Sequence, residues 1–239
     1  MNKQIIYSIL ILMIVGAAVL RNQFSSVPTA AQTGTTPIFV IDAGHGGEDG
    51  GAVSLSGIPE SQINLSVARK LEELLIFYGI PTCMTRKEDI SLHDPGAKTL
   101  REKKVSDLHN RVSYMKSIQN PVLVSIHQNS YQDPRYKGAQ VFFADTPGSD
   151  ILATQIQAVL NESLNRQNAR KPQRIPGTVY LLAHIDCPAV LVECGFLTNP
   201  EEETLLRQND YQKKLSVCIA GAILTSQNPY YQSQENQVL

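Results

Sequence analysis

Four residues of this sequence are of the types that bind metal ions or transfer protons. His45, His127 and Glu193 each follow an apolar run rich in β-branched residues, and Glu60 lies where a glycine-rich segment enters a helical pattern. Two histidines, one carboxylate and a water molecule form an open catalytic zinc site. A second carboxylate can then act as the base. The residue types therefore indicate metal-dependent hydrolysis.

Each of the four also has an ordinary structural interpretation. His45 could be a turn residue, His127 a hydrogen-bonded core histidine, and Glu60 a negative charge favoured by a helix N-terminus. Glu193 is harder to explain in this way, because a carboxylate at the mouth of a buried strand needs a partner or a functional reason. All four fall on one predicted rim of an α/β sheet, where ligands gather beyond the carboxyl ends of the strands. Their convergence favours a functional site.

Other ligand sites fit the sequence less well. The segment 44–51 does not match the dinucleotide pattern G-x-G-x-x-G, because Asp49 occupies the last glycine position, and it lacks the Gly-Lys-Ser/Thr of a P-loop. A metal site of His184, Cys187 and Cys194 would leave the two histidines of the rim unexplained. A phosphate loop and a cysteine-based metal site are therefore both disfavoured.

The elements that would position these residues alternate along the chain, which predicts a single α/β domain with a mostly parallel, twisted sheet and helices on both faces. The helical periodicity places Val105 and Ile151 among the inward-facing residues. Strands are expected over 37–42, 80–85, 122–126, 139–143, 178–182 and 189–192, and helices over 61–78, around 105–115, 151–164 and 201–225.

Composition and the two ends of the chain narrow the class of protein. The 239 residues carry a formal net charge of -1 with no basic stripe, so nucleic acid is not an expected partner. The apolar run 5–20 would span about 24 Å as a helix, short of a bilayer core of about 30 Å. Residues 1–21 are therefore predicted to be a signal peptide or an N-terminal membrane anchor of an exported protein. The expected linker is 22–36, the domain 37–226, and a disordered tail 227–239.

The four cysteines, Cys83, Cys187, Cys194 and Cys218, form no C-x-x-C pair. A disulfide between Cys187 and Cys194 is conceivable in an exported protein. Because most of these cysteines lie in apolar runs, small buried thiols are the expected outcome.

Four motifs together resemble the zinc-dependent N-acetylmuramoyl-L-alanine amidases. These are Asp-Ala-Gly-His-Gly-Gly-Glu-Asp-Gly-Gly-Ala at 42–52, Glu-Ser-Gln-Ile-Asn-Leu at 60–65, Ser-Ile-His-Gln-Asn at 125–129, and the segment around Val-Glu-Cys-Gly at 188–199. They occur in the family's order between about Ile38 and Thr225. The compact layout resembles most the germination-specific, sporulation-associated amidases of the CwlD type.

The resemblance implies a Zn²⁺ ion bound by His45, Glu60 and His127, with Glu193 as the catalytic carboxylate. Weaker candidates for substrate contact are Asn129, Arg86 and Arg174, although Arg86 could equally form a surface ion pair.

The implied reaction is hydrolysis of the amide between N-acetylmuramic acid and L-alanine in peptidoglycan. It would take place at the outer face of the cytoplasmic membrane or in the cell wall or spore cortex space. Its context would be spore cortex maturation (muramic lactam formation) or wall remodelling. The implied protein is a monomer, with an activating partner protein as a further expectation. The alternatives are a zinc peptidase that cuts the stem peptide and a non-catalytic wall-associated module.

Overall fold

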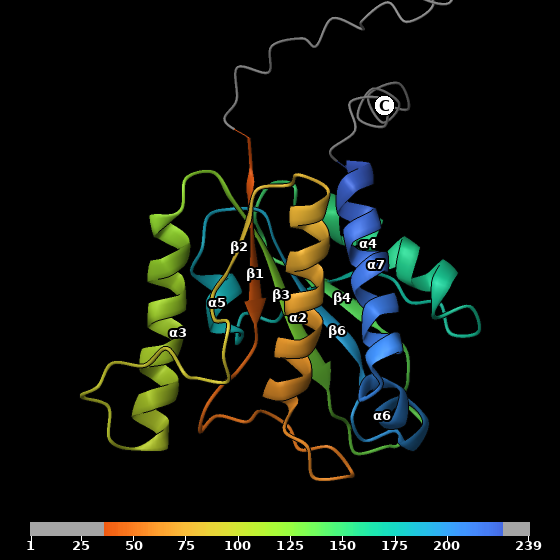
Figure 1. Cartoon of the computed structure of the whole chain (residues 1–239), viewed down its shortest axis with the longest axis horizontal. Helices are drawn as coiled ribbons and strands as arrows, with labels where there is room; N and C mark the ends of the chain where they lie inside the picture. Colours follow the sequence, from red (N-terminus) through yellow and green to blue (C-terminus); the bar gives the residue numbers. More distant parts are fainter. Residues whose placement is uncertain (1–35, 227–239) are drawn as a thin grey trace, which may run out of the picture. The chain divides into compact units, whose positions relative to one another are not determined.

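The computed structural model describes residues 36–226, in which six strands form one sheet with helices on both faces (Figure 1). The strands are β1 (Ile38–Ala43), β2 (Thr82–Met84), β3 (Pro121–Asn129), β4 (Gln140–Phe143), β5 (Gln173–Arg174) and β6 (Ala189–Phe196). The helices are α2 (Glu60–Phe77), α3 (Leu100–Ser117), α4 (Ser149–Ser163), α5 (Tyr180–Ala183), α6 (Pro200–Leu206) and α7 (Asn209–Ser226). The predicted fold class is confirmed.

The sheet has the strand order β2-β1-β3-β6-β4-β5, and every adjacent pair is parallel except β4 and β6. Asp42 of β1 pairs with Ser125 of β3, and His127 of β3 pairs with Glu193 of β6. The carboxyl ends of these three central strands therefore meet at one edge of the sheet. This edge is where an open α/β sheet places its ligand site.

Alternating side chains of the central strands supply two hydrophobic cores. Phe39 and Ile41 belong to the core beneath α2, α4 and α7, whereas Val40 and Leu123 belong to the core beneath α3 and α5. Because successive side chains of a strand point to opposite faces, residues two apart share a face. Asp42, Ser125 and the residues in register with them therefore belong to the α3 and α5 face.

Local sequence signals explain where several helices begin. The Thr99 hydroxyl accepts a hydrogen bond from the Glu102 amide, and the Glu102 carboxylate accepts one from the Thr99 amide, which is a complete capping box for α3. Asn199 caps α6, and Pro200 occupies its first turn. These caps fix the residues at which α3 and α6 begin.

Two expectations about elements are wrong. Residues 178–182 do not form a strand, because Leu181 and Leu182 are both buried and one helical turn, α5, packs them together. A short apolar run cannot be assigned to strand or helix by periodicity alone. The expected helix over 201–225 is divided into α6 and α7, and the Gln212 side chain donates to the Leu206 carbonyl at the break.

Two side chains expected to face inward are exposed. Val105 is 47% exposed in the second turn of α3, and Ile151 is 50% exposed in the first turn of α4. The inward face of α3 is instead partly polar, with Asp107 and Arg111 buried beside Val112. Val112 and Met115 of α3 are buried as the apolar periodicity predicted, and only the start of the stripe, at Val105, is misplaced.

The cysteines within the described residues are free thiols. Cys194 belongs to the core under α2, α4 and α7, and Cys187 packs against the core on the other face, so the sheet separates them and the conceivable disulfide is not present. Between residues 36 and 226, no helix has the length and apolarity to cross a membrane. The expected signal peptide or anchor, the linker up to residue 35 and the expected tail lie outside the described residues.

Candidate active site

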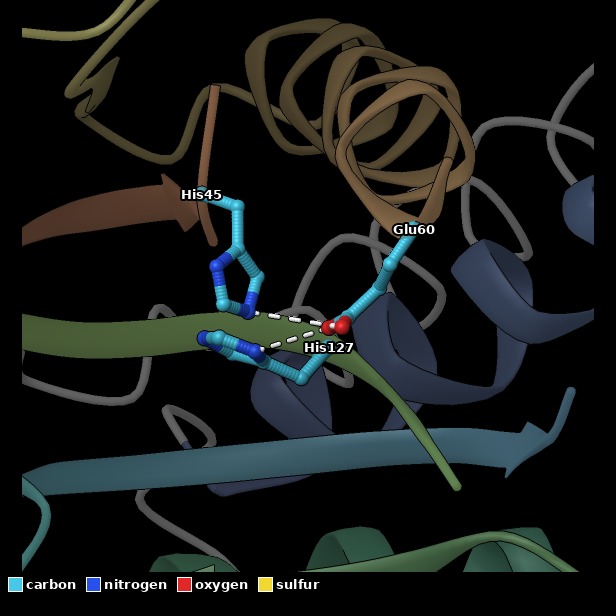
Figure 2. A group of neighbouring side chains, drawn as sticks. All are labelled: His45, Glu60 and His127. Carbon is cyan, nitrogen blue, oxygen red and sulfur yellow. Dashed lines mark hydrogen bonds and ion pairs between the residues drawn. The ribbon is translucent and has the colours of Figure 1, made fainter. Parts of the chain in front are cut away.

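His45, Glu60 and His127 meet at the rim, although they come from three separate parts of the chain (Figure 2). His45 Nε2 lies 3.3 Å from Glu60 Oε2, and His127 Nδ1 lies 3.0 Å from Glu60 Oε1. One ligand atom from each residue lies within 4.8 Å of the other two. Adjacent ligands of a tetrahedral zinc ion with bonds of about 2.1 Å are about 3.4 Å apart. The donor set and its spacing therefore fit a zinc site.

The loop after β1 presents His45 in a strained backbone conformation, with φ of 62°. His45 Nδ1 lies 3.0 Å from Asp49 Oδ2, and Asp49 is also paired with Lys104 Nζ at 2.9 Å. With Nδ1 directed at Asp49, Nε2 is the ring nitrogen of His45 that is left to bind a metal ion, and it lies on the side of Glu60. A carboxylate behind a ligating histidine fixes its ring orientation and raises its basicity.

Two glycines are required beside these ligands. A Cβ on Gly44 would lie 2.2 Å from Cε1 and Nε2 of His127. Gly51 has φ of +71°, and a Cβ there would lie 2.5 Å from Glu60 Oε2. The glycine-rich segment thus lets the backbone approach the ligands closely.

Glu60 is the first residue of α2, where the helix dipole favours a negative charge. Its Oε1 accepts hydrogen bonds from the Gln128 amide at 3.0 Å and from Asn64 Nδ2 at 3.1 Å, and its Oε2 accepts one from the Ala52 amide at 3.0 Å. Burial opposes ionisation, but hydrogen bonds from His127 and His45 hold the pKa of Glu60 well below its usual range. This carboxylate is therefore ionised and fixed in position.

The same carboxylates change the basicity of His45. Burial alone would lower the pKa of its imidazole, but hydrogen bonds to Asp49 and Glu60 raise that pKa to about 9. The negative charges of Asp49 and Glu60 stabilise a proton on the His45 ring, and for the same electrostatic reason they favour a metal cation bound beside it.

Glu193 lies on β6 directly beside His127 of β3. Its Oε2 is buried and has no hydrogen-bond partner among the described residues. Burial raises the pKa of this carboxyl to about 7; His127 and His45 limit the rise, and the negative charge of Glu60 adds to it. A buried carboxylate oxygen without a partner is costly, and such groups occur at functional sites.

Glu193 and His127 line a pocket of about 350 Å³ between the sheet, α3 and α5. Its apolar wall includes Val179, Leu181 and Leu182, and its polar lining includes Asp42, Asp107, Arg111 and Ser125. An apolar wall that faces a few convergent polar groups is typical of a small-molecule or substrate site.

A buried ion network under the pocket was missed by the sequence reasoning. Arg111 pairs with Asp42 and with Asp107 (Nε–Oδ2 2.7 Å), and its Nη2 donates to the His45 carbonyl at 2.7 Å. Asp42 also accepts a 2.6 Å hydrogen bond from Ser125. The network connects α3 to the loop that carries His45. The spacing of Asp107 and Arg111, four residues apart on a helix, was the available signal.

The three expected substrate contacts are placed differently. The Arg86 side chain is fully buried and lies 3.8 Å from the partly exposed Asp89 carboxylate. Its guanidinium donates to the Ala43, Gly44 and Ser61 carbonyls, so these donors are not available to a substrate. These hydrogen bonds hold the loop after β1.

Arg174 is exposed and paired with Asp145 on the edge strand β5. The antiparallel direction of β4 places its neighbour Phe143 beside Val190, near the start of β6 and away from the rim. Asn129 ends β3 at the rim and is partly exposed. Of the three, Asn129 is the one that lies at the rim.

A mixed α/β sheet with a His-Glu-His cluster at its carboxyl edge, next to a carboxyl of raised pKa, is consistent with the site of a metal-dependent hydrolase. Residues 39–225 match the family model of the N-acetylmuramoyl-L-alanine amidases (Amidase_3). The chain belongs to this family.

Similar proteins include the germination-specific N-acetylmuramoyl-L-alanine amidase of Bacillus subtilis, which is 36% identical over 188 residues, 78% of each chain. Among solved structures, the CwlD amidase from Clostridioides difficile in complex with the GerS lipoprotein has a TM-score of 0.75 and 36% identity, covering 79% of this chain and 96% of that one. The catalytic domain of CwlV from Bacillus (Paenibacillus) polymyxa has a TM-score of 0.65 and 28% identity, covering 80% and 97%.

The family assigns the activity. The protein is an N-acetylmuramoyl-L-alanine amidase that acts on peptidoglycan, and its site of action lies outside the cytoplasm. The alternative of a non-catalytic module predicts a missing ligand or base, whereas His45, Glu60 and His127 form a cluster that fits a metal ion.

Proposed function

We propose that this amidase is zinc-dependent, with His45, Glu60 and His127 as the ligands and Glu193 as the general base. The observation that carries the proposal is the buried, unpartnered Oε2 of Glu193, which lies on the strand next to a ligand histidine. A carboxyl with a pKa of about 7 can accept a proton and release it near neutral pH.

Bound zinc would supply a Lewis acid that polarises the scissile carbonyl and lowers the pKa of water. Glu193 would accept a proton from the attacking water and pass it to the departing amine of L-alanine. Asp49 and Arg111 would hold His45 and its loop in place, and the apolar wall of the pocket would limit the access of bulk water. Asn129, at the end of β3, would contact the substrate.

Metal analysis and two substitutions test this assignment. The purified protein should contain about one zinc per chain. Glu193→Gln should retain the metal and lose about 10²- to 10⁴-fold in kcat, since it removes the proton acceptor. Glu201→Gln is the matched control, because Glu201 is exposed on α6. His127→Ala should lose the metal.

Three outcomes would contradict the proposal: an active Glu193→Gln variant, full zinc content in His127→Ala, or a folded, metal-free enzyme with normal turnover. Mass spectrometry of digested muropeptides identifies the bond that is cut. An amidase leaves peptide-free muramic acid, whereas a peptidase of the stem peptide shortens the peptide.

We further propose that the substrate is spore cortex peptidoglycan and that the product serves muramic lactam formation. The support is the 36% identity to the germination-specific amidase of B. subtilis. Cortex from a deletion strain should lack muramic lactam. Unchanged cortex with an altered vegetative wall would instead assign the enzyme to wall remodelling.

We also propose that a monomer of this chain works with an activating partner protein. The C. difficile relative was solved in complex with the GerS lipoprotein, which supports a partner for this chain as well. The purified chain alone should then show lower turnover or zinc content than the same chain isolated with its partner. Full activity of the isolated monomer would exclude the need for one.

A further inference from the structure

Three consecutive apolar side chains at the end of α2 lie in solvent. Ile76 is 56% exposed, Phe77 79% and Tyr78 56%, and no other large apolar side chain between residues 36 and 226 is as exposed as Phe77. The rings of Phe77 and Tyr78 contact each other at 5.2 Å between centroids. We name these three residues the α2-end patch. Single exposed apolar residues are ordinary, but a contiguous group indicates an interaction surface.

The α2-end patch and the active site lie at opposite ends of one helix. Glu60 is the first of the 18 residues of α2 and Phe77 is the last, so about 26 Å of helix separates them. The chain enters the domain at the patch end, where the Phe39 amide donates to the Pro81 carbonyl just after α2. Figure 1 shows the last turn of α2 and the start of β1 at the same, upper end of the domain.

The sequence before β1 indicates which surroundings the patch end of the domain faces. The apolar run 5–20 is separated from Ile38 by 17 mainly polar residues. Seventeen residues cannot span more than about 60 Å even when fully extended. A bilayer that holds the apolar run would therefore lie within reach of the α2-end patch.

The chemistry of the patch fits the interfacial region of a bilayer. Aromatic side chains, tyrosine in particular, are enriched at the boundary between lipid and water. The last turn of α2, Leu74 to Phe77, carries no charge, and Glu72 is paired with Lys87. Contact with the patch therefore requires no anionic lipid.

We propose that the α2-end patch docks on the lipid bilayer of the cytoplasmic membrane. The rim with His45, Glu60 and His127 then faces away from the membrane at a distance of about 25 Å, set by the length of α2. This docking concerns how the enzyme is presented to the wall and does not depend on the zinc assignment.

Tryptophan fluorescence tests the docking, because the chain has no tryptophan. The full chain with Phe77→Trp is reconstituted in phosphatidylcholine vesicles, with and without brominated lipid. Leu55→Trp is the matched control, since Leu55 is 61% exposed in the loop just before α2, at the end of the domain that carries Glu60. Vesicles should shift the Phe77→Trp emission to the blue, and brominated lipid should quench it at least twofold more than the Leu55→Trp emission. Ile76→Ser/Tyr78→Ser added to Phe77→Trp should reduce that difference.

Several outcomes would overturn the proposal. They are equal quenching of the two tryptophans, failure of the full chain to bind the vesicles, or an emission of Phe77→Trp that is already blue-shifted without lipid. In the last case, dependence on protein concentration would identify a second copy as the occupant, and independence would identify the chain itself. Circular dichroism and amidase activity on a soluble muropeptide confirm that each variant is folded.

Discussion

Adding one methyl group at Gly44 tests the geometry of the cluster directly. A Cβ at this position would lie 2.2 Å from two atoms of the His127 ring, whereas non-bonded carbon atoms approach to about 3.5 Å. The ring or the loop must therefore move by about 1 Å in Gly44→Ala. The backbone of Gly44 is not in the left-handed region, so the effect is steric and does not come from strain in φ. His127 Nδ1 would then leave its position 3.0 Å from Glu60.

A displacement of about 1 Å at a reacting centre can cost about 10²-fold in rate. We therefore expect Gly44→Ala to lose about 10²-fold in kcat/KM and to bind zinc more weakly. A competing chelator gives the zinc affinity, and release of peptide from a soluble muropeptide gives the rate. Gly96→Ala is the control, because a Cβ there meets nothing within 4 Å. Wild-type zinc affinity and turnover in a folded Gly44→Ala protein would refute the reasoning that His127 must lie against this glycine.

Two further predictions concern the residues behind the ligands. Asp49→Ala should lower zinc affinity by about 10- to 100-fold in chelator competition, because it removes the carboxylate that orients His45, while Glu48→Ala should change it little; equal effects would assign the loss to charge alone. Protonation of Asp42 in acid should lower the stability of the protein. Although burial opposes its ionisation, Arg111 holds the pKa of this carboxyl at about 2, below its usual range. Its contribution is complete above the unfolded-state pKa and is lost as pH falls through the folded-state pKa. The free energy of unfolding, measured in urea, should therefore drop by about 2 kcal/mol between pH 5 and pH 2, and Asp42→Asn should remove that part of the pH dependence.

The active-site neighbourhood could be predicted from the sequence because its residues lie next to strong local signals. His45, His127 and Glu193 follow apolar runs rich in β-branched residues, which predict buried strands, and Glu60 opens a long amphipathic helix. In a parallel sheet the carboxyl ends of neighbouring strands meet at one edge, so residues far apart in sequence are expected to converge there. The structure brings His45, Glu60 and His127 together as this reasoning expected.

Other features depend on contacts between segments that no local pattern encodes. The antiparallel direction of β4 against β6 places Arg174 away from the rim. Residues 180–183 form a helical turn instead of a strand, and this turn buries both Leu181 and Leu182. Arg86 has the charge of a substrate contact, but its side chain is buried and donates to four backbone carbonyls.

The sequence by itself thus determined the alternation of strands and helices and the residues that can do chemistry, because these follow from residue type and periodicity. The family was indicated by the resemblance of four motifs. Only the tertiary structure decided that Asp42 and Arg111 form a buried pair that holds the His45 loop, and that Phe77 lies exposed at the far end of α2. The physical reason is that burial and pairing depend on which surfaces pack together. A side chain's own sequence neighbours do not specify that packing.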